Sequence, residues 1–170
     1  MREQGANPVL WMSLSALAFS ALLLSAVVLF TTTPDADPEP SPDLSAADVI
    51  RIQVEALQTN DDPYPDAGIE AAFRFASPGN RAATGPLPRF AQMVKGPVYG
   101  DMLDFERAEY SDIALEGDRA AQRVTLVQDD GQRVAYVFTL SRQVGGAYDG
   151  CWMTDGVTRR PPSINGTTRI

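Results

Sequence analysis

The apolar positions of the chain change their spacing twice. Residues 8–30 form one apolar stretch that contains no charged residue. A helix rises about 1.5 Å per residue, so this stretch is long enough to cross the roughly 30 Å hydrocarbon layer of a bilayer. We therefore predict a transmembrane helix over 8–30, preceded by a short cytoplasmic segment, 1–7.

A cleaved signal peptide is the alternative reading of this stretch. Signal peptides carry about 7 to 15 apolar residues followed by a small-x-small cleavage site. The stretch here is longer, and residues 28–33 offer no such site, which favours an uncleaved anchor. The weak positive bias of Arg2 and the terminal amine predicts a cytoplasmic N-terminus, with the following domain in the periplasm. The predicted location is the inner (cytoplasmic) membrane of a bacterium.

Small residues recur at three- and four-residue spacings within the predicted transmembrane helix. Such a seam permits close contact with another membrane helix, although serine and alanine are also ordinary filler. The residues of this seam are Ser13, Ala16, Ser20, Ala21, Ser25 and Ala26.

Residues 31–43 alternate prolines with acidic residues, a composition too polar to pack into a core. Proline-rich segments of this kind are extended spacers, so we predict a linker over 31–43. An acidic strip that docks on a basic partner is the alternative.

Beyond the linker, apolar residues first recur at the three- and four-residue spacing of helices. Ser45 and Asp48 have the spacing of a capping box, which predicts a helix that ends near 60–63. The expected apolar stripe of this helix is Val49, Ile50, Val54 and Leu57. Two further helices are expected over 66–76 and 88–95, the second with Phe90, Met93 and Val94 facing inward. Ser77-Pro78-Gly79-Asn80 reads as the end of the first of these helices.

From Phe105 onward the apolar residues alternate, as in half-buried strands. The expected strands cover 105–113, 122–128, 133–142 and 148–158, with turns at 129–131 and 145–146. Helices followed by an antiparallel meander predict an α+β domain over 44–158, in which a curved four-stranded sheet packs on helices. The polar tail, 159–170, is expected to be irregular.

Composition narrows the possible chemistry. The formal net charge is −8, which argues against a nucleic-acid partner. The chain has no histidine, so hydrolytic triads built on histidine and histidine-ligated zinc are excluded. Its one cysteine, Cys151, excludes an intrachain disulfide, and its place on a predicted strand favours a buried thiol over a reactive one.

Several short runs of residues carry a family resemblance. They are Gln53, Asp61-Asp62, the run Ala72-Phe73-Arg74-Phe75-Ala76-Ser77-Pro78 with Asn80, then Phe90, Met93-Val94, Tyr99, Gln122-Arg123-Val124, Asp130-Gly131, Tyr136 and the closing run from Asp149 to Val157. On these residues the segment 48–157 resembles the family catalogued as domain of unknown function 4864, small exported or anchored bacterial proteins. The resemblance implies a cystatin-like or NTF2-like α+β cone and no particular activity. Residues 63–68, the anchor and the long tail depart from the family pattern.

Cones of this shape often hold a pocket between sheet and helices. The residues expected to line such a pocket are Asp61, Asp62, Tyr99, Tyr136 and Trp152. A carboxylate beside a tyrosine would suit acid/base chemistry. Paired aspartates before a proline are, however, a common helix end, and strand aromatics are commonly core. No catalytic residue, cofactor or metal site is predicted.

Two functions remain open at this point. The favoured hypothesis is a non-catalytic accessory subunit of a larger membrane complex, such as a respiratory or photosynthetic one. Its partners would be other membrane subunits, contacted through the transmembrane helix and the outer domain. The alternative is a membrane-tethered pocket protein that binds or isomerises a small ligand, which requires a cavity of a few hundred Å³ with a polar group facing inward.

Overall fold

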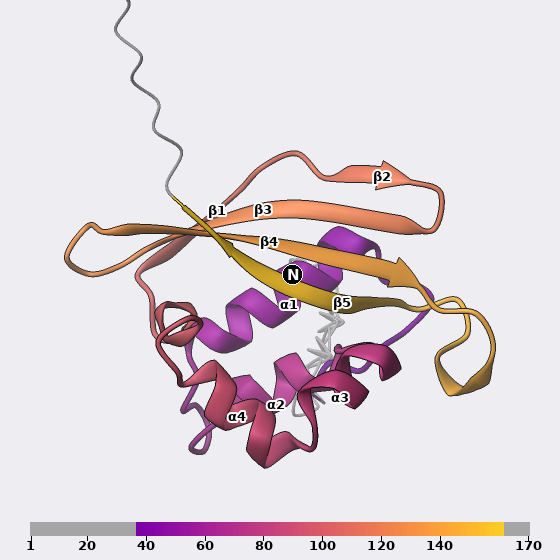
Figure 1. Ribbon diagram of the computed structural model, residues 1–170, viewed down its shortest axis with the longest axis horizontal. Helices are drawn as coiled ribbons and strands as arrows, with labels where there is room; N and C mark the ends of the chain where they lie inside the picture. Colours follow the sequence, from indigo (N-terminus) through magenta and orange to yellow (C-terminus); the bar gives the residue numbers. More distant parts are fainter. Residues whose placement is uncertain (1–36, 162–170) are drawn as a thin grey trace, which may run out of the picture. The chain divides into compact units, whose positions relative to one another are not determined.

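Helices precede strands along the chain, and the computed structural model, which describes residues 37–161, places them on one face of an antiparallel sheet (Figure 1). This arrangement confirms the predicted α+β class. The helices are α1 (Ala46–Gln58), α2 (Ala67–Arg74), α3 (Pro78–Thr84) and α4 (Leu87–Val94), and the short 3-10 turns are η1 (Gly100–Met102) and η2 (Gly146–Tyr148). The strands are β1 (Arg107–Tyr110), β2 (Ala114–Glu116), β3 (Arg119–Val127), β4 (Arg133–Arg142) and β5 (Trp152–Arg160).

The capping box predicted for the first helix is present. The Ser45 hydroxyl accepts a hydrogen bond from the Asp48 amide, and the Asp48 carboxylate accepts one from the Ser45 amide at 2.9 Å. The hydrogen bonds from Ser45 hold the pKa of the Asp48 carboxyl below its usual value. α1 therefore begins where the sequence predicts, and it buries the expected stripe of Val49, Ile50 and Val54.

Helix α3 is absent from the sequence-based prediction, which took Ser77 and Pro78 for the end of the preceding helix. In the structure Ser77 is the N-cap of α3 and Pro78 occupies its first turn. Serine followed by proline suits this role, because the hydroxyl caps a free amide and proline lacks the amide that would need capping. α2 ends early because the Ser77 amide donates to the Thr154 carbonyl at 2.9 Å, and the Thr154 amide donates to the Phe75 carbonyl at 2.8 Å.

The sheet has the order β1-β3-β4-β5, and β2 pairs separately with β3. The predicted strand 105–113 is thus wrong in its extent, because the edge chain pairs with β3 in two pieces. At the break, the Ser111 hydroxyl accepts from the Arg123 amide at 3.1 Å, and the Gln122 side chain donates to the Ser111 carbonyl at 2.7 Å. Hydrogen bonds made by the side chains of Ser111 and Gln122 here replace part of the backbone pairing with β3. Beyond this break β2 forms, so the sheet has five strands instead of the predicted four.

The last strand starts at Trp152, four residues later than predicted. The turn η2 precedes it, and Gly150 has a positive φ of 78° that favours glycine. Cys151, Trp152, Met153 and Thr154 are all buried, so the expected alternation is absent there. The reason is that residues 75–77 pair with the free edge of β5 and make this end an interior part of the sheet.

Part of the predicted linker contacts the domain. Arg74 on α2 forms ion pairs with Asp37 at 3.0 Å and with Glu39 at 3.6 Å. Both acidic side chains are more than half exposed, so these pairs contribute little to stability. Two acidic residues of this segment, Asp37 and Glu39, thus face a basic residue of the same chain.

None of the helices within residues 37–161 has the length and apolar character needed to span a membrane. The predicted transmembrane helix 8–30 with its seam of small residues, the segment 1–7, the linker residues before Asp37 and the tail after Pro161 all lie outside the described residues.

Candidate functional site

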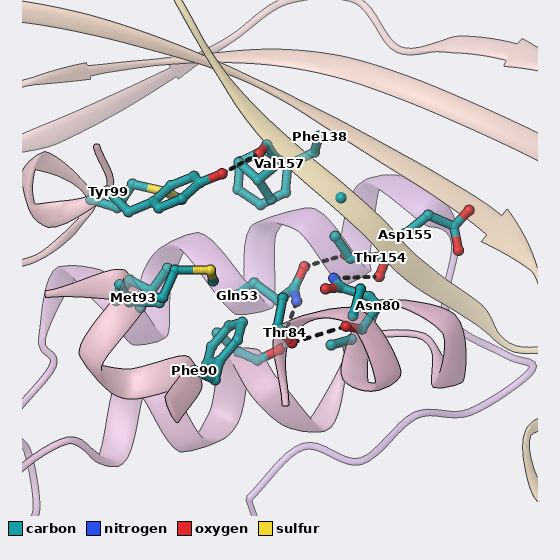
Figure 2. Close-up of a pocket in the computed structure, with 17 residues that line it drawn as sticks. Gln53, Asn80, Thr84, Phe90, Met93, Tyr99, Phe138, Thr154, Asp155 and Val157 are labelled. Carbon is teal, nitrogen blue, oxygen red and sulfur yellow. Dashed lines mark hydrogen bonds between the residues drawn. The ribbon is translucent and has the colours of Figure 1, made fainter. Parts of the chain in front are cut away.

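A cavity of about 270 Å³ lies between the helical layer and the sheet (Figure 2). All four helices, the turn η1 and the strands β4 and β5 contribute to its wall. The lining residues are Gln53, Leu57, Ala72, Ala76, Asn80, Ala83, Thr84, Phe90, Met93, Val94, Tyr99, Met102, Phe138, Thr154, Asp155, Gly156 and Val157.

Most of the wall is apolar. α4 has the predicted inward face, on which Phe90, Met93 and Val94 stand three and four residues apart. Phe90 is supported from behind by Phe73, whose ring centre lies 5.1 Å away at a tilt of 53°. Phe138 on β4 closes the sheet side. The aromatic residues therefore frame the cavity and do not fill it.

Four polar residues gather at one end of the cavity, around the start of β5 (Figure 2). The Thr154 hydroxyl donates to Gln53 Oε1 at 2.6 Å, and Gln53 Nε2 donates to the Ala72 carbonyl at 2.8 Å. Asn80 Nδ2 donates to the backbone carbonyl of Thr154 at 3.0 Å, and the Thr84 hydroxyl donates to the backbone carbonyl of Asn80 at 2.9 Å. These bonds fix the side chains before any ligand enters.

Tyr99 lines another part of the cavity. Its hydroxyl donates to the Val157 carbonyl at 3.0 Å, and its ring stacks on Tyr136 with centres 6.3 Å apart. Tyr136 is fully buried behind it, and its own hydroxyl donates to the Val98 carbonyl at 2.9 Å. Burial raises the pKa of Tyr136 to about 12, so this side chain stays protonated and neutral at ordinary pH.

The other predicted pocket residues lie elsewhere. Asp61 accepts hydrogen bonds from the Asn60 side chain at 2.7 Å and from the Asp66 amide at 3.0 Å, so it orders the loop between α1 and α2. Asp62 lines a separate hollow beside Pro63. Trp152 lines an outer groove, where the Arg142 guanidinium lies 5.1 Å from the centre of the indole. Of the five predicted residues, Tyr99 is the one that lines the cavity.

Sequence reasoning about the pocket missed Gln53, Asn80, Thr84 and Thr154. One signal was available for Gln53, a polar residue within the apolar stripe of α1 that is buried to 4% exposure. Gln53 and Asn80 are also among the residues that carry the family resemblance. Thr154 lies in the closing run that also carries this resemblance, whereas Thr84 had no comparable signal.

The cavity wall carries little charge. Among the described lining residues, Asp155 is the acidic one, and its exposed carboxylate points away from the neighbouring polar residues (Figure 2). Cys151 lies outside the lining and is buried to 3% exposure, and burial raises the pKa of its thiol. The wall can therefore make apolar contacts and neutral hydrogen bonds with a bound molecule.

Comparison with protein-family models matches residues 41–164 to the family described as Domain of unknown function (DUF4864). No curated protein and no solved structure matches the chain significantly. The matched segment covers more than half of the 170 residues and includes every residue that lines the cavity. The chain belongs to the DUF4864 family.

Proposed function

We propose that this protein binds a small, neutral and largely apolar molecule in the cavity between its helices and its sheet. The role is binding without catalysis. Within the proposal, the α+β domain is a cystatin-like or NTF2-like cone held at the periplasmic face of the inner membrane by the helix predicted over 8–30.

The observation that carries the proposal is the composition of the cavity wall. Apolar side chains from α4, α1 and β4 surround most of it, and a few polar groups gather at one end. Small-molecule sites have this character, and a volume of about 270 Å³ lies near the lower end of their usual range. The polar groups are held by bonds to the backbone, which lowers the ordering cost of binding.

Binding is favoured over catalysis by the groups that face the cavity. The chain has no histidine, and the described lining contains one carboxylate, on exposed Asp155. General acid–base chemistry requires a titratable group within hydrogen-bonding reach of the reacting atom. The amides and hydroxyls found here suit recognition of a ligand better than proton transfer.

Titration of the whole chain with 2-heptanone tests the proposal. Selective ¹³C labelling of methionine methyl groups gives reporters at Met93 and Met102, which line the cavity, and an internal reference at Met153, which is buried elsewhere. We expect saturable shifts at Met93 and Met102 and none at Met153.

Two exposed alanines of α3 provide a matched pair of variants. Ala83 lines the cavity, whereas Ala82 does not, so Ala83→Trp blocks it and Ala82→Trp leaves it open. Binding should be lost in Ala83→Trp and kept in Ala82→Trp. Absence of any saturable shift in the unmodified chain would overturn the proposal.

A second candidate is the accessory-subunit role favoured by the sequence. The observation in its support is an apolar outer groove formed by Leu44, Ile113, Leu115 and Trp152, in which Leu115 is 62% exposed. Isolation of the whole chain in mild detergent, followed by mass spectrometry, should recover a stoichiometric membrane partner if this role is correct. Leu115→Glu should release that partner, whereas Val144→Glu, at a position 89% exposed outside the groove, should not. Recovery of the chain alone would contradict it.

A further inference from the structure

We infer that the cavity selects a ligand with a neutral carboxamide-type head, a group that both donates and accepts a hydrogen bond. This inference rests on the proposed function, because it names the class of molecule that the same cavity takes.

The orientations of two side-chain amides are set by the protein. Gln53 Nε2 donates to the Ala72 carbonyl, and Asn80 Nδ2 donates to the Thr154 carbonyl. A backbone carbonyl only accepts hydrogen bonds, so each amide must place its nitrogen toward that carbonyl. Neither amide can be reversed without losing its bond.

These orientations leave one acceptor and one donor without a partner among the described residues. Asn80 Oδ1 accepts no hydrogen bond from residues 37–161, and Gln53 Nε2 uses one of its two hydrogens. Both side chains line the cavity, and both are bonded to Thr154, one through its hydroxyl and the other through its carbonyl. The free acceptor and the free donor therefore belong to one polar patch (Figure 2).

A primary carboxamide complements this patch. Its N–H donates to Asn80 Oδ1, and its carbonyl accepts from Gln53 Nε2. A ketone of the same shape satisfies the donor, but its methyl group cannot donate to Asn80 Oδ1 and displaces water from it, so one hydrogen bond is lost. A carboxylate cannot donate, and no lysine or arginine is among the lining residues of the described chain to neutralise it.

A series of ligands matched in shape tests the selection on the unmodified whole chain. The probes are hexanamide, 2-heptanone and hexanoate at pH 7, read through the methyl resonances of Met93 and Met102. Hexanamide should bind about tenfold more tightly than 2-heptanone, and hexanoate more weakly than both. Equal affinities for hexanamide and 2-heptanone would overturn the inference and leave the proposed binding function standing. Failure of every probe to bind would overturn both.

Two variants locate the selecting atom. Asn80→Leu removes the free acceptor, so the ratio of the affinities for hexanamide and 2-heptanone should fall to about one. Gln92→Leu makes a similar change from a side-chain amide to leucine on the exposed face of α4, outside the lining of the cavity, and it should keep the tenfold ratio. A preserved ratio in a folded Asn80→Leu chain would contradict the assignment. If that variant does not fold, the comparison of hexanamide with 2-heptanone on the unmodified chain still tests the inference.

Discussion

The hydroxyl of Thr154 lies 2.6 Å from Oε1 of Gln53, and both side chains are almost fully buried although 101 positions separate them in the sequence. Gln53 also donates to the carbonyl of Ala72. One glutamine side chain therefore joins α1 to α2 and to β5 beside the cavity.

Replacement of Gln53 by leucine should lower the free energy of unfolding by about 2 kcal/mol, because the Thr154 hydroxyl and the Ala72 carbonyl lose their partner in a buried site. Thr154→Val should cost a similar amount. In the double variant, the loss of unfolding free energy should be smaller than the sum of the two single losses by about 1 kcal/mol or more, as measured by urea denaturation. Gln58→Leu on the same helix removes a more exposed hydrogen bond to Glu106 and should cost about 0.5 kcal/mol or less. Full additivity would show that the two side chains do not act together.

A second prediction concerns the close approach of α1 and α2 at Gly68. A Cβ atom at this position would lie 2.1 Å from the Ala56 carbonyl oxygen, which is backbone and cannot rotate away. Gly68→Ala should therefore destabilise the domain by about 2 to 3 kcal/mol. Gly79→Ala on α3 is the control, since its Cβ would meet nothing closer than 3.8 Å, and it should be neutral or stabilising. Thermal unfolding of the two variants distinguishes them, and similar midpoints would refute the packing argument.

The buried phenol of Tyr136 makes stability depend on pH in the alkaline range. Its pKa is about 12 in the folded chain, mainly because of burial, and about 10 when unfolded. Between these pH values the unfolded state has lost the phenol proton that the folded state keeps. The contribution of Tyr136 to the free energy of unfolding is therefore complete below pH 10 and is lost as the pH rises toward 12.

The comparison of wild-type chain with Tyr136→Phe isolates this effect from the other tyrosines. The stability advantage of the wild-type chain, measured by urea denaturation from pH 9 upward, should shrink across this window. A constant difference would mean that Tyr136 does not titrate as its environment predicts.

Cys151 should be inert toward thiol reagents in the folded protein. Its side chain is buried to 3% exposure, and burial raises the pKa of the thiol, which lowers the population of reactive thiolate. Reaction with a chromogenic disulfide at neutral pH should be slower by on the order of a hundredfold than in denaturing urea. Because the chain has one cysteine, Cys151→Ser provides a complete blank. Rapid native labelling would show that this end of β5 opens readily.

Local patterns predicted those elements whose signals lie within a few residues. Ser45 and Asp48 marked the start of α1, and the spacing of Phe90, Met93 and Val94 gave the inward face of α4. α3 was missed because Ser77 and Pro78 serve equally well as the end of one helix and the start of the next. The structure resolves that ambiguity through pairing of residues 75–77 with β5, a contact between distant parts of the chain.

The cavity was harder to predict than the fold. Tyr99 was predicted to line the cavity, and it does. Asp61 and Asp62 were predicted to line it as well, but both lie in the loop between α1 and α2, where Asp61 accepts a hydrogen bond from the Asp66 amide. Gln53 could have been suspected as a polar residue in an apolar stripe. Its hydrogen bond with Thr154 could not have been predicted, because that bond depends on the register of the strands and on how the helices pack on the sheet. The accessory-subunit hypothesis came from the predicted anchor, whereas the pocket hypothesis gains its support from the wall of the cavity.

The backbone hydrogen bonds between residues 75–77 and β5 allow amide hydrogen exchange to report whether a ligand occupies the cavity. The amides of Ser77 and Thr154 donate these bonds, and Thr154 also anchors both amide side chains of the polar patch. Opening of the cavity must break these bonds before deuterium can replace the two protons. A bound molecule stabilises the closed form by mass action, so the isotope exchange of these two amides should slow in proportion to occupancy.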